Sequence, residues 1–223
     1  MEWNFLGSDY DTQSSFYGTQ KACEPVHAQL DLTDGSVDLI NLHEARSLEV
    51  RVRVVSLDGK VISDQTNQVK AAANARTPVS RPDLEKLADG HTVVVALHVS
   101  DAVGAPISEN LYWWSKEEAT LRELDNLAKA TLTTSATMAS DGNERKATVQ
   151  IKNSGAVAAL MIKLTLNNAT TGERILPAYY SENYVSLLPG EERTVTVQFP
   201  AGSTKPMFGV RGWNLETSTI EAK

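Results

Sequence analysis

The chain of 223 residues is long enough for one large domain or two of ordinary size, and it is acidic, with a net charge of −7. An acidic chain whose Lys and Arg residues are scattered is not expected to bind nucleic acid or an anionic membrane. The single cysteine, Cys23, excludes an intrachain disulfide, and no apolar run is long enough to span a membrane.

Residues 1–22 are aromatic and polar without a clean hydrophobic period. They begin with neither a basic segment nor an apolar core, so they do not predict a signal peptide. Within them, Ser14–Ala22 is predicted as a short helix that Pro25 ends. Trp3, Phe16 and Tyr17 then need a surface to pack on, and nothing nearby in the sequence supplies one.

From His27 the hydrophobic period changes to two, which is typical of β-strands. Asp34-Gly35 is a turn sequence that indicates a hairpin, and segment 78–87 is predicted as a loop with one helical turn. Strands are expected at 28–32, 36–42, 48–54, 60–62 and 91–99. Many short strands separated by turns indicate an all-β sandwich.

Segment 106–115 contains three adjacent aromatic residues. Because neighbouring side chains on a strand point to opposite faces, at least one of these rings must face a second surface, either another domain or a ligand. An interdomain contact is favoured, since such rings supply a large contact area. The residues expected in interdomain contacts are Trp3, Phe16, Tyr17, Tyr112, Trp113 and Trp114.

Residues 115–128 carry the one good helical pattern, which is short and marginal when isolated. A second series of strands follows, at 132–138, 147–152, 158–166, 194–199 and 208–215, with Leu160, Ile162, Leu164 and Leu166 expected on one face. The predicted fold class is all-β, with two immunoglobulin-like β-sandwich domains joined by a short helical linker. The sandwiches are expected at 23–115 and 128–223, and the linker at 116–127.

The stretch from Tyr179 to Tyr184 is too polar for a core strand and too aromatic for an ordinary loop. Loops on a β-scaffold commonly carry binding groups, so this stretch is a candidate binding loop. Its candidate residues are Tyr180, Ser181, Glu182, Asn183 and Tyr184. The alternative is a turn in which the tyrosines fasten the loop to the sandwich while Glu182 and Asn183 cap it.

Motifs for metal or cofactor chemistry are not evident in the sequence. The four histidines, His27, His43, His91 and His98, have no metal-ligand spacing to one another, and no glycine-rich phosphate loop is present. Glu182 is the only acid embedded among aromatics, and no second acid is visibly held opposite it. The sequence therefore predicts no cofactor, no metal site and no catalytic residue.

Three segments in the same order resemble the C-terminal part of glycoside hydrolase family 2 enzymes, in the branch of exo-β-D-glucosaminidases, β-mannosidases and mannosylglycoprotein endo-β-mannosidases. Segment 16–27 is similar to the junction after the catalytic barrel, and 109–115 to the strand that closes the next domain. Segment 176–191, together with Arg211–Asn214, is similar to the final immunoglobulin-like domain of the glucosaminidase branch.

The resemblance implies a non-catalytic accessory region, because the family's acid pair lies in barrel segments that this chain does not contain. Residues 1–22 would be the tail of a catalytic barrel, and loop 180–184 would lie at the rim of the substrate cleft. The partners implied are the parent's catalytic barrel and, through its cleft, a carbohydrate, with a periplasmic or secreted location favoured for the parent. The alternatives are a stand-alone carbohydrate-binding module and a structural or adhesion array of β-sandwiches.

Overall fold

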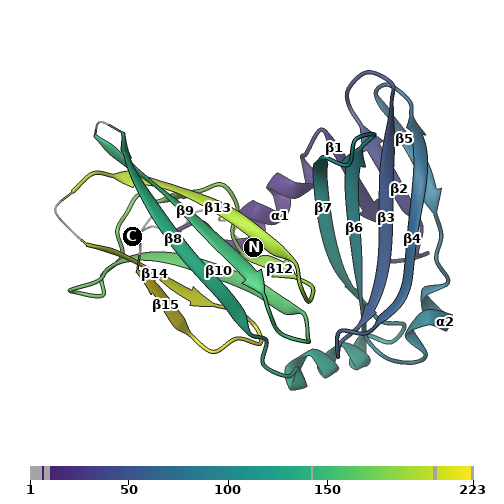
Figure 1. Cartoon of the computed structure of the whole chain (residues 1–223). Coiled ribbons are helices and arrows are strands. Elements are labelled where there is room, and N and C mark those ends of the chain that lie inside the picture. Colours follow the sequence, from purple (N-terminus) through teal and green to yellow (C-terminus); the bar gives the residue numbers. More distant parts are fainter. Residues whose placement is uncertain (1–6, 8–10, 142, 203–204, 222–223) are drawn as a thin grey trace. The chain divides into compact units, whose positions relative to one another are not determined.

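The computed structural model describes residue 7 and residues 11–141, 143–202 and 205–221. The chain divides into two compact units (Figure 1). One comprises residues 20–127 and holds what we call the first sandwich. The other comprises residues 128–223 together with 1–19 and holds the second sandwich. Each contains two antiparallel β-sheets, so the predicted all-β fold class with two sandwiches is confirmed.

In the first sandwich, a three-stranded sheet faces a four-stranded one. The three-stranded sheet has the order β1 (Val26–Leu30), β2 (Val37–Asn41), β5 (Ala75–Ser80). The four-stranded sheet has the order β4 (Val61–Ala71), β3 (Arg46–Ser56), β6 (Val93–Asp101), β7 (Pro106–Trp114). Leu39, Leu48 and Leu97 lie fully buried in the core between the sheets.

Two predictions for this half were wrong in detail. Segment 78–87, predicted as a loop with one helical turn, does contain that turn as the helix α2 (Leu84–Ala88), but it also contains the end of β5, which was not predicted. Pro78 is tolerated in β5 because this strand lies at a sheet edge and pairs with β2 across a register shift. Only the start of β4 was predicted, because most of its side chains are exposed and give no apolar alternation.

The free edge of β1 is closed by side chains of β7 instead of by another strand. Asn110 Nδ2 donates to the Ala28 carbonyl at 2.9 Å, and the Tyr112 hydroxyl hydrogen-bonds to the main chain of Leu30. These two residues occupy alternate positions of β7 and therefore point to the same face. An unpaired strand edge is thus satisfied within the first sandwich.

In the second sandwich, both sheets have four strands. One has the order β12 (Val185–Leu187), β10 (Ala159–Asn168), β14 (Pro206–Arg211), β15 (Ser218–Glu221). The other has the order β11 (Tyr179–Tyr180), β13 (Glu192–Pro200), β9 (Glu144–Asn153), β8 (Leu132–Asp141). Ile151, Leu164 and Phe208 are among the buried residues of its core.

The second sandwich departs from the predicted strands at two points. Met161 has a φ of 54°, and the pairing of β10 with β12 shifts register there. Consequently Ala159, and not Leu160, joins Ile162 in the core cluster. The expected closing strand at 208–215 ends instead at Arg211, and after a turn the chain returns as β15.

Two helical segments flank the first sandwich in the sequence. The helix α1 spans Ser14–Ala22, as predicted. The second segment is a 3₁₀ helix, η1 (Glu118–Asn126), whose N-cap residue makes no side-chain capping bond. It is fixed to the first sandwich, because Glu123 accepts a hydrogen bond from the Thr92 main chain at 2.8 Å and Leu124 is buried.

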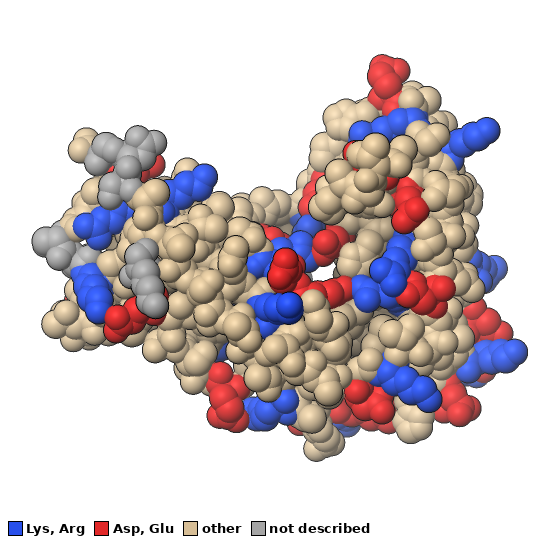
Figure 2. Space-filling model, viewed as in Figure 1, with Lys and Arg blue, Asp and Glu red and all other residues tan. Residues whose placement is uncertain are grey.

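Charges on the described surface are mixed. On the face in Figure 2, Lys and Arg residues are interspersed with Asp and Glu residues, as on an ordinary solvated surface. Among the described residues, no helix is both long enough and apolar enough to cross a membrane.

Candidate functional site

The candidate loop, residues 180–184, connects β11 to β12 and is fastened at its start. The Ser181 main-chain N–H donates to the Thr196 carbonyl at 2.9 Å, and Ser181 Oγ accepts from the Thr196 N–H at 3.0 Å. Ser181 therefore ties the loop to β13 through both its main chain and its side chain.

Asn183 and Tyr180 take the place of a missing strand beside β10. The strand β12 pairs with β10 only from Ala159 to Ile162. Beyond that point, Asn183 Oδ1 accepts from the Leu164 N–H at 2.8 Å and Nδ2 donates to the Leu164 carbonyl at 3.0 Å. The Tyr180 hydroxyl accepts from the N–H of Leu166 at 2.8 Å. Burial raises the pKa of Tyr180, so its hydroxyl stays protonated at neutral pH.

Tyr184 closes the loop against a buried lysine. It has a φ of 55°, and its ring centroid lies 5.1 Å from Lys163 Nζ and 6.1 Å from the ring centroid of Tyr17. Tyr17 is itself buried, and burial raises its pKa to about 12. The end of the loop is therefore packed between β10 and the segment made of α1 and the residues just before it.

A charged cluster holds that segment in place. The Lys163 side chain is only 5% exposed, and its Nζ donates to Asp11 Oδ2 at 2.8 Å. Arg174 Nη2 lies 2.7 Å from the same oxygen. Burial alone would raise the pKa of the Asp11 carboxyl, but hydrogen bonds from Arg174 and Lys163 hold it below its usual value. Asp11 is therefore an anion that two cations share.

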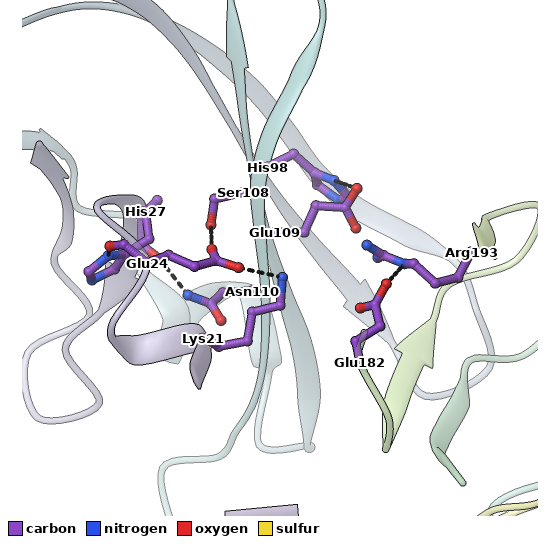
Figure 3. Close-up of polar contacts among 10 residues, drawn as sticks. Lys21, Glu24, His27, His98, Ser108, Glu109, Asn110, Glu182 and Arg193 are labelled. Atoms are coloured by element: carbon purple, nitrogen blue, oxygen red, sulfur yellow. Dashed lines mark hydrogen bonds and ion pairs between the residues drawn. The ribbon is translucent and has the colours of Figure 1, made fainter. Parts of the chain in front are cut away.

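Glu182 is the acid of the loop, and it faces a base. Its Oε1 lies 3.8 Å from Nε of Arg193 on β13, and the two side chains are 21% and 19% exposed, respectively (Figure 3). The carboxylate therefore has an opposite charge beside it.

The residues expected in interdomain contacts have different surroundings. Trp3 lies outside the described residues. Phe16 is partly exposed and packs edge-to-face on Tyr17, with ring centroids 5.2 Å apart. Tyr112 and Trp114 pack against the core of the first sandwich, whereas Trp113 lies at the intervening position of β7. An interdomain role for these rings remains a prediction.

Sequence reasoning missed Asp11, Lys163 and Arg174. The signal that could have found them is a lone lysine between Ile162 and Leu164, inside an apolar strand. A lysine at such a position needs a buried anion. Nothing in the sequence names Asp11 as that anion, because 152 positions separate the two residues.

The histidines lie in separate places on the first sandwich. His98 Nε2 lies 2.8 Å from a guanidinium nitrogen of Arg53, and His98 is near Glu109 (Figure 3). His27 Nδ1 lies 2.7 Å from the Glu24 carbonyl. In the described parts of the chain, no group of three or more His, Cys, Asp or Glu side chains is arranged to hold a metal ion.

Two family models match the chain. Residues 41–116 match a mannosidase Ig/CBM-like domain, and residues 110–215 match the Ig-fold domain of exo-β-D-glucosaminidase. Together the two matches extend from residue 41 to residue 215.

Curated relatives match over the whole chain. An exo-β-D-glucosaminidase of Streptomyces avermitilis is 27% identical over 100% of this chain and 28% of its own length. A mannosylglycoprotein endo-β-mannosidase of Lilium longiflorum is 26% identical over 96% of this chain and 29% of its own length. The chain thus spans less than a third of the length of these relatives.

Solved structures agree with the relatives. The Amycolatopsis orientalis exo-chitosanase CsxA matches 99% of this chain and 29% of its own, with a TM-score of 0.89 and 26% identity. A β-D-mannosidase from Dictyoglomus thermophilum, at 18% identity and a TM-score of 0.71, shares the fold. The chain therefore contains the immunoglobulin-like domains found in exo-β-D-glucosaminidases and mannosidases of glycoside hydrolase family 2.

Proposed function

We propose that this chain is the non-catalytic accessory region of a β-glycosidase that hydrolyses β-glucosaminides or β-mannosides. The observation that carries the proposal is the match to CsxA, which covers 99% of this chain but 29% of that enzyme. A retaining glycosidase needs two carboxyl groups about 5 Å apart. The acid of the candidate loop, Glu182, instead faces the guanidinium of Arg193.

In this proposal, residues 1–22 are the tail of the catalytic barrel, and the second sandwich braces the barrel through them. The contacts of Asp11 with Lys163 and Arg174 support this role, because they join that segment to the second sandwich through one buried and two partly exposed charges. The packing of Tyr17 on Tyr184 adds an apolar contact between the same two regions.

Loop 180–184 contributes to the rim of the substrate cleft in this proposal. Tyr180 and Asn183 use their polar atoms on β10, so they would shape the loop without binding the sugar directly. Glu182 would then be the charged group that the loop presents, and the exposed ring of Tyr179 comes just before the loop in the chain. A region that offers rings as well as an acid suits a sugar, which has apolar faces and polar edges.

The test is to express the complete reading frame that encodes this chain and to measure hydrolysis of aryl β-D-glucosaminide and aryl β-D-mannoside. We expect turnover of one of these substrates by the complete product and none by the 223-residue chain. A reading frame that encodes no catalytic domain would overturn the proposal. So would turnover by the isolated chain that is abolished when one of its own acids is mutated.

The second candidate is a stand-alone carbohydrate-binding module. The observation that favours it is the match of residues 41–116 to a mannosidase Ig/CBM-like domain. Such a module would bind sugar tightly by itself, whereas a cleft rim would bind weakly because most of the cleft is elsewhere. A binding titration of the isolated chain distinguishes the two.

A further inference from the structure

The first sandwich has an open pocket of about 580 Å³ on the sheet formed by β1, β2 and β5. This volume lies in the range of roughly 300–1,000 Å³ that is typical of small-molecule sites. The lining residues that matter for its chemistry are Leu30, Asp31, Leu32, Asp38, Arg76 and Tyr112. All of them belong to residues 20–127, so the pocket is formed by one unit.

A buried carboxylate lies in the wall of the pocket. Asp38 is on the central strand β2, and its side chain is 6% exposed. Its Oδ2 lies 2.9 Å from Arg76 Nε, and this is the one hydrogen-bond or ion-pair partner that Asp38 has in the described structure. Buried carboxylates commonly accept several hydrogen bonds, so Oδ1 has acceptor capacity to spare.

Arg76 supplies the complementary donors. Its side chain is 62% exposed, and its one ion-pair contact in the described structure is with Asp38 through Nε. The terminal nitrogens of the guanidinium are therefore available to a ligand in the pocket. Acceptor and donor together can bond two neighbouring hydroxyl groups of one molecule.

The pocket also has apolar lining residues, and one of them, Tyr112, is held in a fixed position. Tyr112 is held in position because its ring packs on the core and its hydroxyl bonds to the main chain of Leu30. Leu32, in the turn after β1, is more than half exposed. Single exposed leucines are common, but here the leucine lies beside a tyrosine and a buried ion pair.

These surroundings discriminate among ligand classes. A phosphate or carboxylate ligand would meet two carboxylates, Asp31 and Asp38, for one guanidinium. A purely apolar ligand would cover the ion pair without returning its hydrogen bonds. A sugar ring satisfies both parts of the pocket, because its edge carries hydroxyl groups and its face is apolar.

We infer that this pocket binds a pyranose sugar residue. Two adjacent hydroxyl or amino substituents of the ring bond to Asp38 and Arg76, and an apolar face of the ring lies toward Tyr112 and Leu32. The site is on a different sandwich from loop 180–184, and it does not depend on the function proposed above.

The test is to titrate the 223-residue chain with β-1,4-linked glucosamine and mannose disaccharides. Binding is measured by NMR chemical-shift changes and by calorimetry. We expect affinity of roughly millimolar strength, as suits one open pocket. Removing a charge-assisted hydrogen bond by Arg76→Gln or Asp38→Asn should weaken binding about tenfold. R76Q leaves the buried Asp38 carboxylate without its cation and should lower the melting temperature by several degrees, so binding is compared at a temperature where both proteins are fully folded.

The matched control is Arg51→Gln. Arg51 pairs with Asp64 on the same sandwich, through bonds of 2.7 and 2.5 Å, and neither residue lines the pocket. We expect R51Q to change the affinity by less than twofold. The proposal is overturned if neither disaccharide shifts a resonance at tens of millimolar, if R76Q binds as well as the parent, or if R51Q weakens binding as much as R76Q does.

Discussion

Both sandwiches complete an unfinished strand edge with one asparagine and one tyrosine. In the first, Asn110 and Tyr112 reach the main chain of β1 from alternate positions of a rigid strand. In the second, Asn183 reaches β10 from a loop, and Tyr180 reaches it from the two-residue strand β11 that precedes the loop. The side chains of the first pair are positioned by one long strand, whereas those of the second pair depend on how the loop is held.

The residues that hold Asn183 and its loop in place are distant from the loop in the sequence. Tyr184 follows Asn183 and packs between Lys163 and Tyr17. Lys163 in turn requires Asp11, which precedes α1. The same combination of an asparagine and a tyrosine is therefore positioned by a single strand in the first sandwich. In the second sandwich it depends on a segment that is distant in the sequence.

The largest contrast is expected between Asn183→Ala and Asn110→Ala. N183A leaves the buried N–H and carbonyl of Leu164 unpaired, which should cost about 2–4 kcal/mol of unfolding free energy. N110A leaves only one group unpaired, the Ala28 carbonyl, in a bond that is part-buried, and should cost about 1 kcal/mol.

Urea unfolding measures the free energy of unfolding of each variant, and NMR hydrogen exchange measures the protection of individual amides. The Leu164 amide should lose protection in N183A and keep it in N110A. Equal losses of unfolding free energy in the two variants would show that Asn183 contributes no more to stability than Asn110 does.

The next largest loss of stability is expected from a mutation of Asp11, in the segment before α1. Asp11→Asn removes the carboxylate that Lys163 and Arg174 share, and it should destabilise the chain by about 2–3 kcal/mol, since Asp11 is partly exposed. The control is Asp64→Asn, which breaks an exposed pair with Arg51 and should cost about 1 kcal/mol or less. If D11N costs no more than D64N, the segment is not needed to hold the loop.

The contrast between the two edges also explains what the sequence could predict. The strands β3 and β13 were found because their apolar residues alternate within a few positions. The strand β4 is largely exposed and β5 contains Pro78, so neither has that pattern. The shift at Met161 is invisible in the sequence, because a positive φ inside an apolar run leaves no compositional trace.

The candidate loop was located by its composition, but its contacts were not predicted. Three tyrosines beside Glu182 and Asn183 are recognisable in the sequence alone. That Asn183 bonds to Leu164, nineteen positions earlier, depends on where β12 stops pairing with β10. The sequence also gave no means of pairing Asp11 with Lys163.

A smaller effect is expected from pH. The pKa of Asp11 in the folded chain lies below its ordinary value near 3.8. The stability that its ionisation contributes is therefore fully present above about pH 4 and is lost as the pH falls through the lower folded pKa. D11N should accordingly lose less stability than the parent chain between pH 5 and pH 2, measured by urea unfolding at each pH. Parallel pH profiles would contradict the assignment of this charge cluster.

The smallest effect on stability, and the one that bears on function, is expected from Glu182→Ala. The pair of Glu182 with Arg193 is long, at 3.8 Å, and both side chains keep some contact with solvent. Its loss should therefore cost about 1 kcal/mol or less.

If the loop forms the rim of the cleft, E182A in the complete reading-frame product should raise KM or lower kcat several-fold while the melting temperature changes little. Glu192→Ala, at an exposed position on β13, is the control and should leave both kinetics and melting unchanged. If E182A instead lowers the melting temperature by several degrees and the folded fraction keeps its kcat and KM, Glu182 fastens the loop and takes no part in the cleft. The edge bonds of Asn183 and Tyr180 are intact in this variant, so the experiment separates what the loop presents from what holds it.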